Sequence, residues 1–141
     1  MASKTTQSAN DVLNYMLRNV APSWDGASTL YLSLHTGAVG LGGNQTTNEA
    51  NYTGYARVAL TRNSSGAFTA ASSGSSSNAA LIQFGIATGG TLPQTITHVA
   101  LGENASSTGT VIATAALNSS LVINLNIRPE FDAGTLVVQE Q

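Results

Sequence analysis

The chain contains no cysteine among its 141 residues, which excludes a disulfide framework and any catalysis by a thiolate. Charged residues make up only 9% of the sequence, against roughly 25% in typical soluble domains. Five basic and seven acidic residues leave a net charge of −2. This balance provides neither the basic patch that nucleic acid requires nor a polybasic membrane signal. We therefore expect no nucleic-acid partner and no membrane partner.

Long apolar runs are also missing from the sequence. No segment approaches the roughly 18 consecutive apolar residues that a membrane span needs. The N-terminal residues MASKTTQSAN lack the apolar stretch of a secretory signal peptide. The lack of cysteine is compatible with assembly in a reducing cytoplasm.

Hydrophobic residues make up 42% of the chain, enough for a buried core, and the length suits a single domain over residues 1–141. Serine, threonine, asparagine and glycine take the place of the missing charges. Charges are depleted from interface cores because their desolvation costs energy, so a surface of this kind favours packing against further copies of the chain. A monomer with the same serine- and threonine-rich surface is the alternative.

The N-terminal region predicts a polar arm over residues 1–8 and a helix over residues 9–20. Ser8 and Asp11 have the spacing of a capping box, and Pro22 ends the helical pattern. A helix this short is unstable alone, so its apolar stripe must pack on the sheets or on a neighbouring subunit. The stripe consists of Leu13, Met16, Leu17 and Val20.

Strand patterns occupy residues 29–140, with turn signals between them. About eight strands at this spacing, without intervening helices, predict an all-β fold: an antiparallel β-sandwich or jelly roll with one short N-terminal α-helix. Ser72–Asn78 reads as a polar turn or flexible loop. The expected strands are Thr29–Thr36, Tyr55–Arg62, Gly66–Ala71, Ala79–Thr88, Thr95–Glu103, Thr110–Leu117, Ser119–Ile127 and Gly134–Gln139.

The strand expected at Ser119–Ile127 has the cleanest alternation in the chain. The pattern predicts that it ends at Arg128-Pro129, because proline cannot donate a ladder hydrogen bond. The alternation predicts four inward-facing side chains, Leu121, Ile123, Leu125 and Ile127.

A loop of about eighteen residues, rich in glycine, asparagine and threonine, separates the first two strands. Long loops on a rigid scaffold often carry function. We expect Glu49 and Arg57 to form a salt bridge that pins the loop. Tyr52 and Tyr55, at its end, are candidate interface anchors, while a role for Tyr55 in capping the core is the alternative. The loop glycines meet neither the P-loop nor the dinucleotide-binding pattern.

No residue pattern indicates a catalytic, cofactor or metal site. His35 and His98 are the only histidines, fewer than the three or four ligands of a zinc site, and we expect both to make structural polar contacts. His35 in particular should hydrogen-bond the base of the long loop. Serine is frequent, but the G-x-S-x-G motif is absent. The seven carboxylates are scattered: Asp11, Asp25, Glu49, Glu103, Glu130, Asp132 and Glu140.

The segment LYLSLHTGAVG…NEANYTGYARVAL resembles the LHT…G…E…YAR signature of small bacteriophage virion structural proteins. These proteins are described as head decoration (cement) proteins or as tail-fibre-like proteins. The resemblance extends over nearly the whole chain: an amphipathic helix precedes the signature, and SNAALIQFGIAT, THVALGE and a closing apolar strand follow it.

The resemblance implies a non-enzymatic capsid decoration protein, assembled in the host cytoplasm and bound to the outer surface of the capsid. There it would form a homo-oligomer, expected to be a trimer, and stabilise contacts between subunits of the major capsid protein. The alternative is a tail fibre or baseplate component that binds a receptor or glycan. No cofactor is expected. The candidate interface residues are Leu13, Met16, Tyr52, Tyr55, Arg57 and Glu49.

Overall fold

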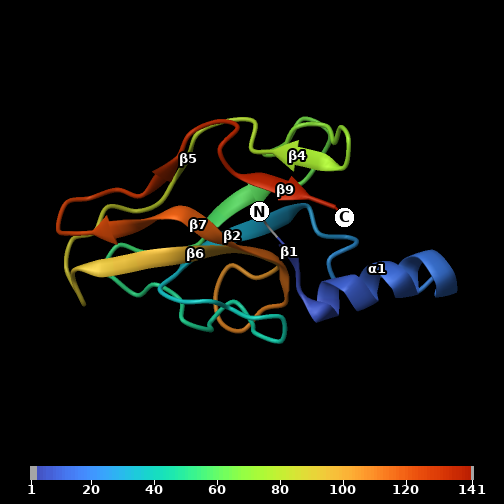
Figure 1. The fold of residues 1–141 in the computed structure, drawn as a ribbon, viewed down its shortest axis with the longest axis horizontal. Helices are drawn as coiled ribbons and strands as arrows, with labels where there is room; N and C mark the ends of the chain where they lie inside the picture. The colour runs from blue at the N-terminus through green and yellow to red at the C-terminus, as the bar shows by residue number, and fades with distance from the viewer. Residues whose placement is uncertain (1–2, 141) are drawn as a thin grey trace.

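The computed structural model describes residues 3–140, and its helix and strands are shown in Figure 1. One helix, α1, lies near the N-terminus and is followed by a series of strands, as the sequence predicts. The elements in chain order are β1 (Ser3–Lys4), α1 (Thr6–Arg18), β2 (Thr29–His35), β3 (Val58–Thr61), β4 (Ser75–Ser77), β5 (Ile82–Gln83), β6 (Gln94–Gly102), β7 (Val111–Ile123), β8 (Glu130–Phe131) and β9 (Val137–Gln139).

The main sheet has five strands in the order β1-β7-β6-β2-β3, and every neighbouring pair is antiparallel. Long β6 and β7 form its centre. The β2–β6 pairing places His35 opposite His98. Opposite this sheet lie two small antiparallel pairs, β4–β9 and β5–β8. The prediction of a mostly β, antiparallel fold with one N-terminal helix is confirmed, although the second layer consists of short pairs.

The main core lies between the sheet and these short pairs. It takes Leu32 and Leu34 from β2, Ile96 and Val99 from β6, and Phe84 from the chain after β5, together with neighbouring apolar side chains. The opposite face of the sheet has only a small apolar cluster, Val39, Ala100 and Val111. Here the long loop after β2 covers the sheet, which explains why both faces of β2 are buried from Leu32 to His35.

The helix begins earlier than the sequence predicts. Its N-cap is Thr5, whose Oγ1 accepts the Ser8 backbone N–H at 3.2 Å, so the capping box at Ser8 and Asp11 is wrong. The polar-arm prediction is wrong for residues 3–8, because Ser3–Lys4 pairs with β7 and Thr5 is buried; residues 1–2 lie outside the described range. The helix ends at Arg18, with Asn19 in the left-handed conformation at φ 55°.

Several strands differ from their predicted extents. Thr110–Leu117 and Ser119–Ile127 are largely one strand, β7, whose register against β6 shifts between Ile96 and His98. The strand ends at Ile123, before Arg128-Pro129. Ser72–Asn78 contains β4, which pairs with β9. Gly66–Ala71 holds only an isolated bridge, and the Ala79–Thr88 and Tyr55–Arg62 strands are shorter than predicted.

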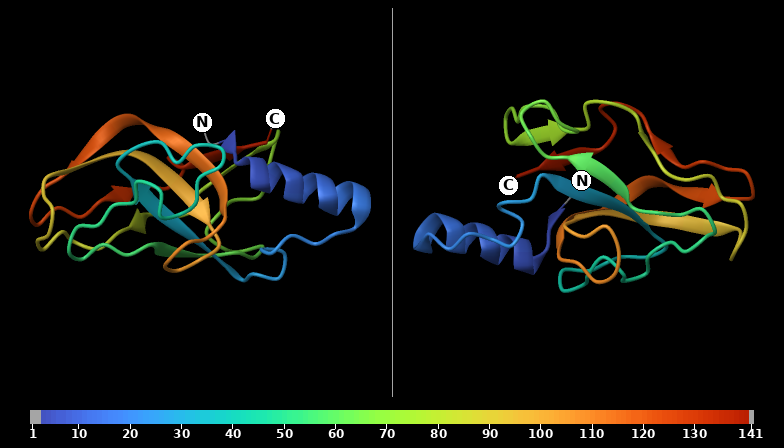
Figure 2. Two further views of the ribbon diagram at one scale, coloured as in Figure 1. Left: turned by 90° about the horizontal axis from the view of Figure 1, so that it is seen from below. Right: turned by 180° about the vertical axis from the view of Figure 1, so that it is seen from behind.

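The helix projects from one end of the molecule, whereas the last residues of β7 and the segment after it lie at the opposite end of the long axis (Figures 1 and 2). Both ends of the described chain meet near the base of the helix, where Lys4 of β1 forms an ion pair with Glu140. The backbone N–H of Glu140 also donates to the Gly74 carbonyl at 2.8 Å.

Candidate interaction surfaces

His35 fixes the base of the long loop, as predicted. Its side chain is fully buried, with Nδ1 2.8 Å from the Thr47 carbonyl and Nε2 2.8 Å from Ser33 Oγ. A carbonyl can only accept, so Nδ1 carries the proton. Nε2 faces the Ser33 hydroxyl, whose oxygen also lies 3.2 Å from the Ala100 carbonyl. Burial lowers the pKa of His35 below its ordinary value and outweighs the opposing effect of the Thr47 contact.

Glu49 and Arg57 form the predicted salt bridge, with both guanidinium–carboxylate contacts at 2.7–2.8 Å. The Arg57 side chain is 3% exposed and that of Glu49 is 16% exposed. Arg57 also donates to the carbonyls of Asn104 and Ser107 at 2.9 and 2.8 Å. The hydrogen bonds with Glu49 raise the pKa of Arg57. The pair therefore joins the long loop to the β6–β7 loop and is not available as an exposed charged contact.

Gln45 makes a second connection between the same two loops. Its side chain is fully buried, accepts the Asn104 backbone N–H at 2.9 Å and donates to the Asn104 carbonyl at 3.2 Å. Glycines at 102 and 109 leave the room it needs, because an added Cβ would lie 2.2 Å and 2.0 Å from its side-chain atoms. The sequence contains no motif that predicts this contact, which depends on segments about sixty residues apart.

The two tyrosines at the end of the long loop are part of the core. Tyr52 is 2% exposed and its hydroxyl donates to the Gly85 carbonyl at 3.0 Å, so its assignment as an exposed anchor is wrong. Tyr55 packs against the core, with its ring stacked 6.2 Å from that of Phe84, and its hydroxyl donates to Glu49 Oε1 at 2.8 Å. Burial raises the pKa of Tyr52 to about 12 and raises that of Tyr55 further. For Tyr55 the alternative, a core role, is confirmed.

Leu13 and Met16 lie apart from this network, on the projecting helix. They are 54% and 72% exposed, and Leu17 and Val20 of the same stripe are 76% and 48% exposed. The only fully buried side chain of α1 is Ser8. The stripe therefore does not pack on the sheets. We call Leu13, Met16, Leu17 and Val20 the helix ridge.

A second exposed apolar patch lies at the opposite end of the molecule from α1. We call Ile86, Val122, Leu125 and Ile127 the end patch; they are 39%, 47%, 57% and 41% exposed. Leu125 and Ile127 are thus not inside, because β7 ends at Ile123 and the chain turns at Asn126, with φ 66°. Backbone bonds between Ala87 and residues 126 and 127, at 2.7 and 2.9 Å, hold the two segments of the patch together. The alternation of apolar and polar residues continues past Ile123, so the sequence pattern does not indicate that β7 ends there.

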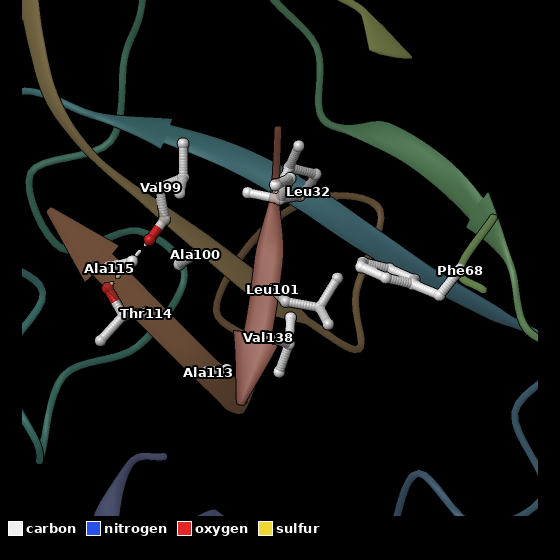
Figure 3. A pocket seen from close by; sticks show the side chains of 10 residues that line it. Leu32, Phe68, Val99, Ala100, Leu101, Ala113, Thr114, Ala115 and Val138 are labelled. Carbon is white, nitrogen blue, oxygen red and sulfur yellow. Dashed lines mark hydrogen bonds between the residues drawn. The ribbon is translucent and has the colours of Figure 1, made fainter. Parts of the chain in front are cut away.

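Two of the hollows on the surface are lined mainly by apolar side chains. One apolar cavity of about 20 Å³ lies where β9 crosses the main sheet, among Leu32, Phe68, Leu101 and Val138 (Figure 3). It has room for about one water but offers it almost no polar partners. A larger groove of about 460 Å³ separates α1 from the sheet and is lined by Val12, Met16, Trp24, Ile112 and Val138, among others.

Within residues 3–140, no three histidine, cysteine or acidic side chains lie close enough to hold a metal ion together. None of the helices in that range has the length and apolar character required to cross a membrane. His98 is half-buried on β6, with Nδ1 2.8 Å from the Thr97 hydroxyl.

The chain forms an antiparallel scaffold with tightly tied loops and two groups of exposed apolar side chains. The chain belongs to the Podophage GP4 fiber I protein gp80 family, whose model matches residues 3–139. It is therefore a fibre component of the podophage virion and not an enzyme. None of the curated proteins compared with the chain matches it significantly.

Proposed function

We propose that this chain is a building block of a podophage fibre and acts only through protein–protein contacts. The family match over residues 3–139 carries the proposal, because it covers nearly the whole chain and names a fibre protein. The surface supports it: two groups of exposed apolar side chains face solvent, and few charges oppose burial of these groups.

The fibre role receives more support than the capsid-cement role expected from the sequence resemblance. A cement protein that bridges subunits of the major capsid protein would also need low charge and exposed apolar surface, so these properties do not separate the two roles. The family description names a fibre and not a capsid protein. A glycan-binding rim built on Tyr52 and Tyr55 has lost its basis, because both rings pack into the core.

The copy number of the chain in purified virions tests this function. We would measure it by quantitative mass spectrometry against the major capsid protein, with antibody labelling of the particles by electron microscopy. A few copies per hundred capsid subunits, with label confined to fibres, is the expected result. A ratio near one to one would favour capsid cement and overturn the fibre role. Absence from the virion would exclude both roles.

A further inference from the structure

The apolar side chains exposed on this molecule are concentrated at its two ends. Of the twelve large apolar side chains that are exposed in the described chain, four form the helix ridge and four form the end patch. Tyr15, on the same helix, is a further one. The helix and the segments that carry the end patch lie at opposite ends of the long axis (Figure 1). Most of the exposed apolar surface is therefore arranged along one direction.

The ridge is a continuous line on one side of α1. At 100° per residue, Leu13, Met16 and Leu17 fall within about 100° of one another, while the charged Asp11 and Arg18 fall on the other side of the helix. Val20 lies just beyond the left-handed cap Asn19, after the end of α1. Helix α1 contacts the body mainly near its first turns, where Ser8 is buried. The side chains of the ridge carry no charge and are largely exposed, although Met16 also lines the groove that it shares with Lys4 and Glu140.

The end patch has matching chemistry and is rigid. Asparagines 124 and 126 flank Leu125 with uncharged amides, and the hydrogen bonds to Ala87 fix the turn that carries it. A fixed surface loses little conformational entropy on binding. The patch therefore presents a preformed apolar surface of a size similar to the ridge.

We propose that copies of this chain associate head to tail, with the helix ridge of one copy packed on the end patch of the next. This proposal rests on the fibre function proposed above. Two different patches that meet in this way form a heterologous contact, which propagates into a filament when its rotation does not close a ring. We favour a second copy of the chain as the partner of both surfaces. In a row of copies, one repeated contact buries the helix ridge and the end patch of every copy except those at the two ends of the row.

The exposed area predicts how strong one such contact is. With roughly 100 Å² for a fully exposed aliphatic side chain, the ridge and the end patch together expose on the order of 400 Å² of apolar surface. Apolar atoms make up about 60% of the area of an interface. An interface that contains this much apolar surface is therefore smaller than the ~1,200 Å² of total buried area found in stable complexes. A single contact is therefore weak, and a row of copies gains strength through many contacts and high local concentration.

Cysteine crosslinking tests this arrangement, because the chain has no cysteine of its own. Leu17→Cys carries a thiol on the ridge and Leu125→Cys carries one on the end patch. The two variants, one of them with a size tag, are mixed at about 1 mM, where a millimolar contact is substantially occupied, and oxidised. We expect disulfide-linked pairs that contain one copy of each variant, at least fivefold above the pairs formed with Leu81→Cys, an exposed leucine outside both patches.

A double variant with both cysteines should form a ladder of linked chains, and adding Leu13→Glu should reduce the ladder at least fivefold. Leu13 is exposed, so circular dichroism and thermal unfolding should verify that this variant folds. Crosslinks only between two copies of Leu17→Cys would indicate symmetric helix packing, such as a trimer, and would overturn the proposal. Absence of mixed pairs at this concentration would overturn it as well. Copy number and location in the virion would be unaffected by either result, so the fibre role is judged separately.

Discussion

Arg57 holds two loops of the chain together through one guanidinium group, which contacts Glu49 of the long loop and the carbonyls of Asn104 and Ser107 in the β6–β7 loop. Arg57→Met would leave the largely buried Glu49 carboxylate without its partner. Removal of one member of a buried pair costs about 3 kcal/mol or more, so we expect the free energy of unfolding to fall by about 3 kcal/mol in urea titrations.

Two further variants separate lost pairing from general damage at Arg57. Adding Glu49→Gln to Arg57→Met removes the unpaired charge and should restore part of the loss. Arg18→Met, on the exposed helix, should change stability by less than about 0.5 kcal/mol. A loss below about 1 kcal/mol in Arg57→Met would contradict a structural role for the pair.

Gly109 is required because of Gln45. An alanine Cβ at position 109 would lie 2.0 Å from Gln45 Oε1, and overpacking of this kind costs roughly 1–3 kcal/mol. We expect Gly109→Ala to lose that amount in urea unfolding, and to lose clearly less in a Gln45→Ala background, where only the weaker clash with Asn104 Cβ, at 2.8 Å, remains. Gly26→Ala is the control, since nothing lies within 4 Å of its added Cβ. Equal losses in both backgrounds would refute the explanation.

His35 makes stability depend on pH. The unfolded chain protonates this imidazole near pH 6.5, whereas burial keeps its pKa lower in the folded state. Below pH 6.5 the unfolded state therefore binds more protons, and the free energy of unfolding falls as the pH decreases toward the folded pKa. The urea midpoint of the wild type should be lower at about pH 5.5 than at about pH 7.5, and this difference should be smaller in His35→Gln. A wild-type midpoint that stays constant over this range would contradict the lowered pKa.

Among the elements, α1 depends on a single residue at its start. Thr5 caps the helix through Ser8 and donates its hydroxyl to the Val111 carbonyl of β7, so it joins helix and sheet. Thr5→Val keeps the shape and removes both bonds, at an expected cost of about 1–2 kcal/mol. Thermal unfolding and helical circular dichroism measure the effect. The exposed Thr6→Val should change stability little; an equal loss there would argue against the cap.

The sequence predicted best those strands in which apolar and polar residues alternate along the chain. Strands β2 and β6 alternate in sequence and are both interior strands of the sheet, and the predictions Thr29–Thr36 and Thr95–Glu103 match the structure within a residue. The helix start was misplaced because Thr5 and Ser8 are both good caps. Only the partner on β7 decides between them, and local sequence does not contain that information.

The same reasoning explains which parts of the candidate surfaces were found. The Glu49–Arg57 pair and the His35 contact lie near each other in sequence and were predicted. Tyr52 was assigned to the surface because its position after a polar loop suggested exposure, but it packs on residues some thirty positions away. The end patch was missed because the alternation over Ser119–Ile127 continues past the point where β7 ends.

For the whole molecule, the low charge predicts how the proposed association of copies responds to salt. With a net charge of −2 and two ion pairs that are internal to the described chain, long-range electrostatic forces between copies are weak. Salt screens exposed charges within about 10 Å at 0.1 M, but it does not weaken apolar contacts. Association in concentrated solution, measured as average mass by light scattering, should therefore stay constant from about 50 mM to about 500 mM NaCl.

Ammonium sulfate should strengthen the association, because sulfate is excluded from protein surfaces and so favours the burial of apolar groups. We expect the average mass to rise with ammonium sulfate in the wild type and to rise much less in Leu17→Glu, which places a charge on the helix ridge. Leu81→Glu adds the same charge outside both patches and should behave like the wild type. A fall in average mass with NaCl alone would show that charged groups stabilise the contact between copies. That result would contradict a contact formed by the exposed apolar ends of the molecule.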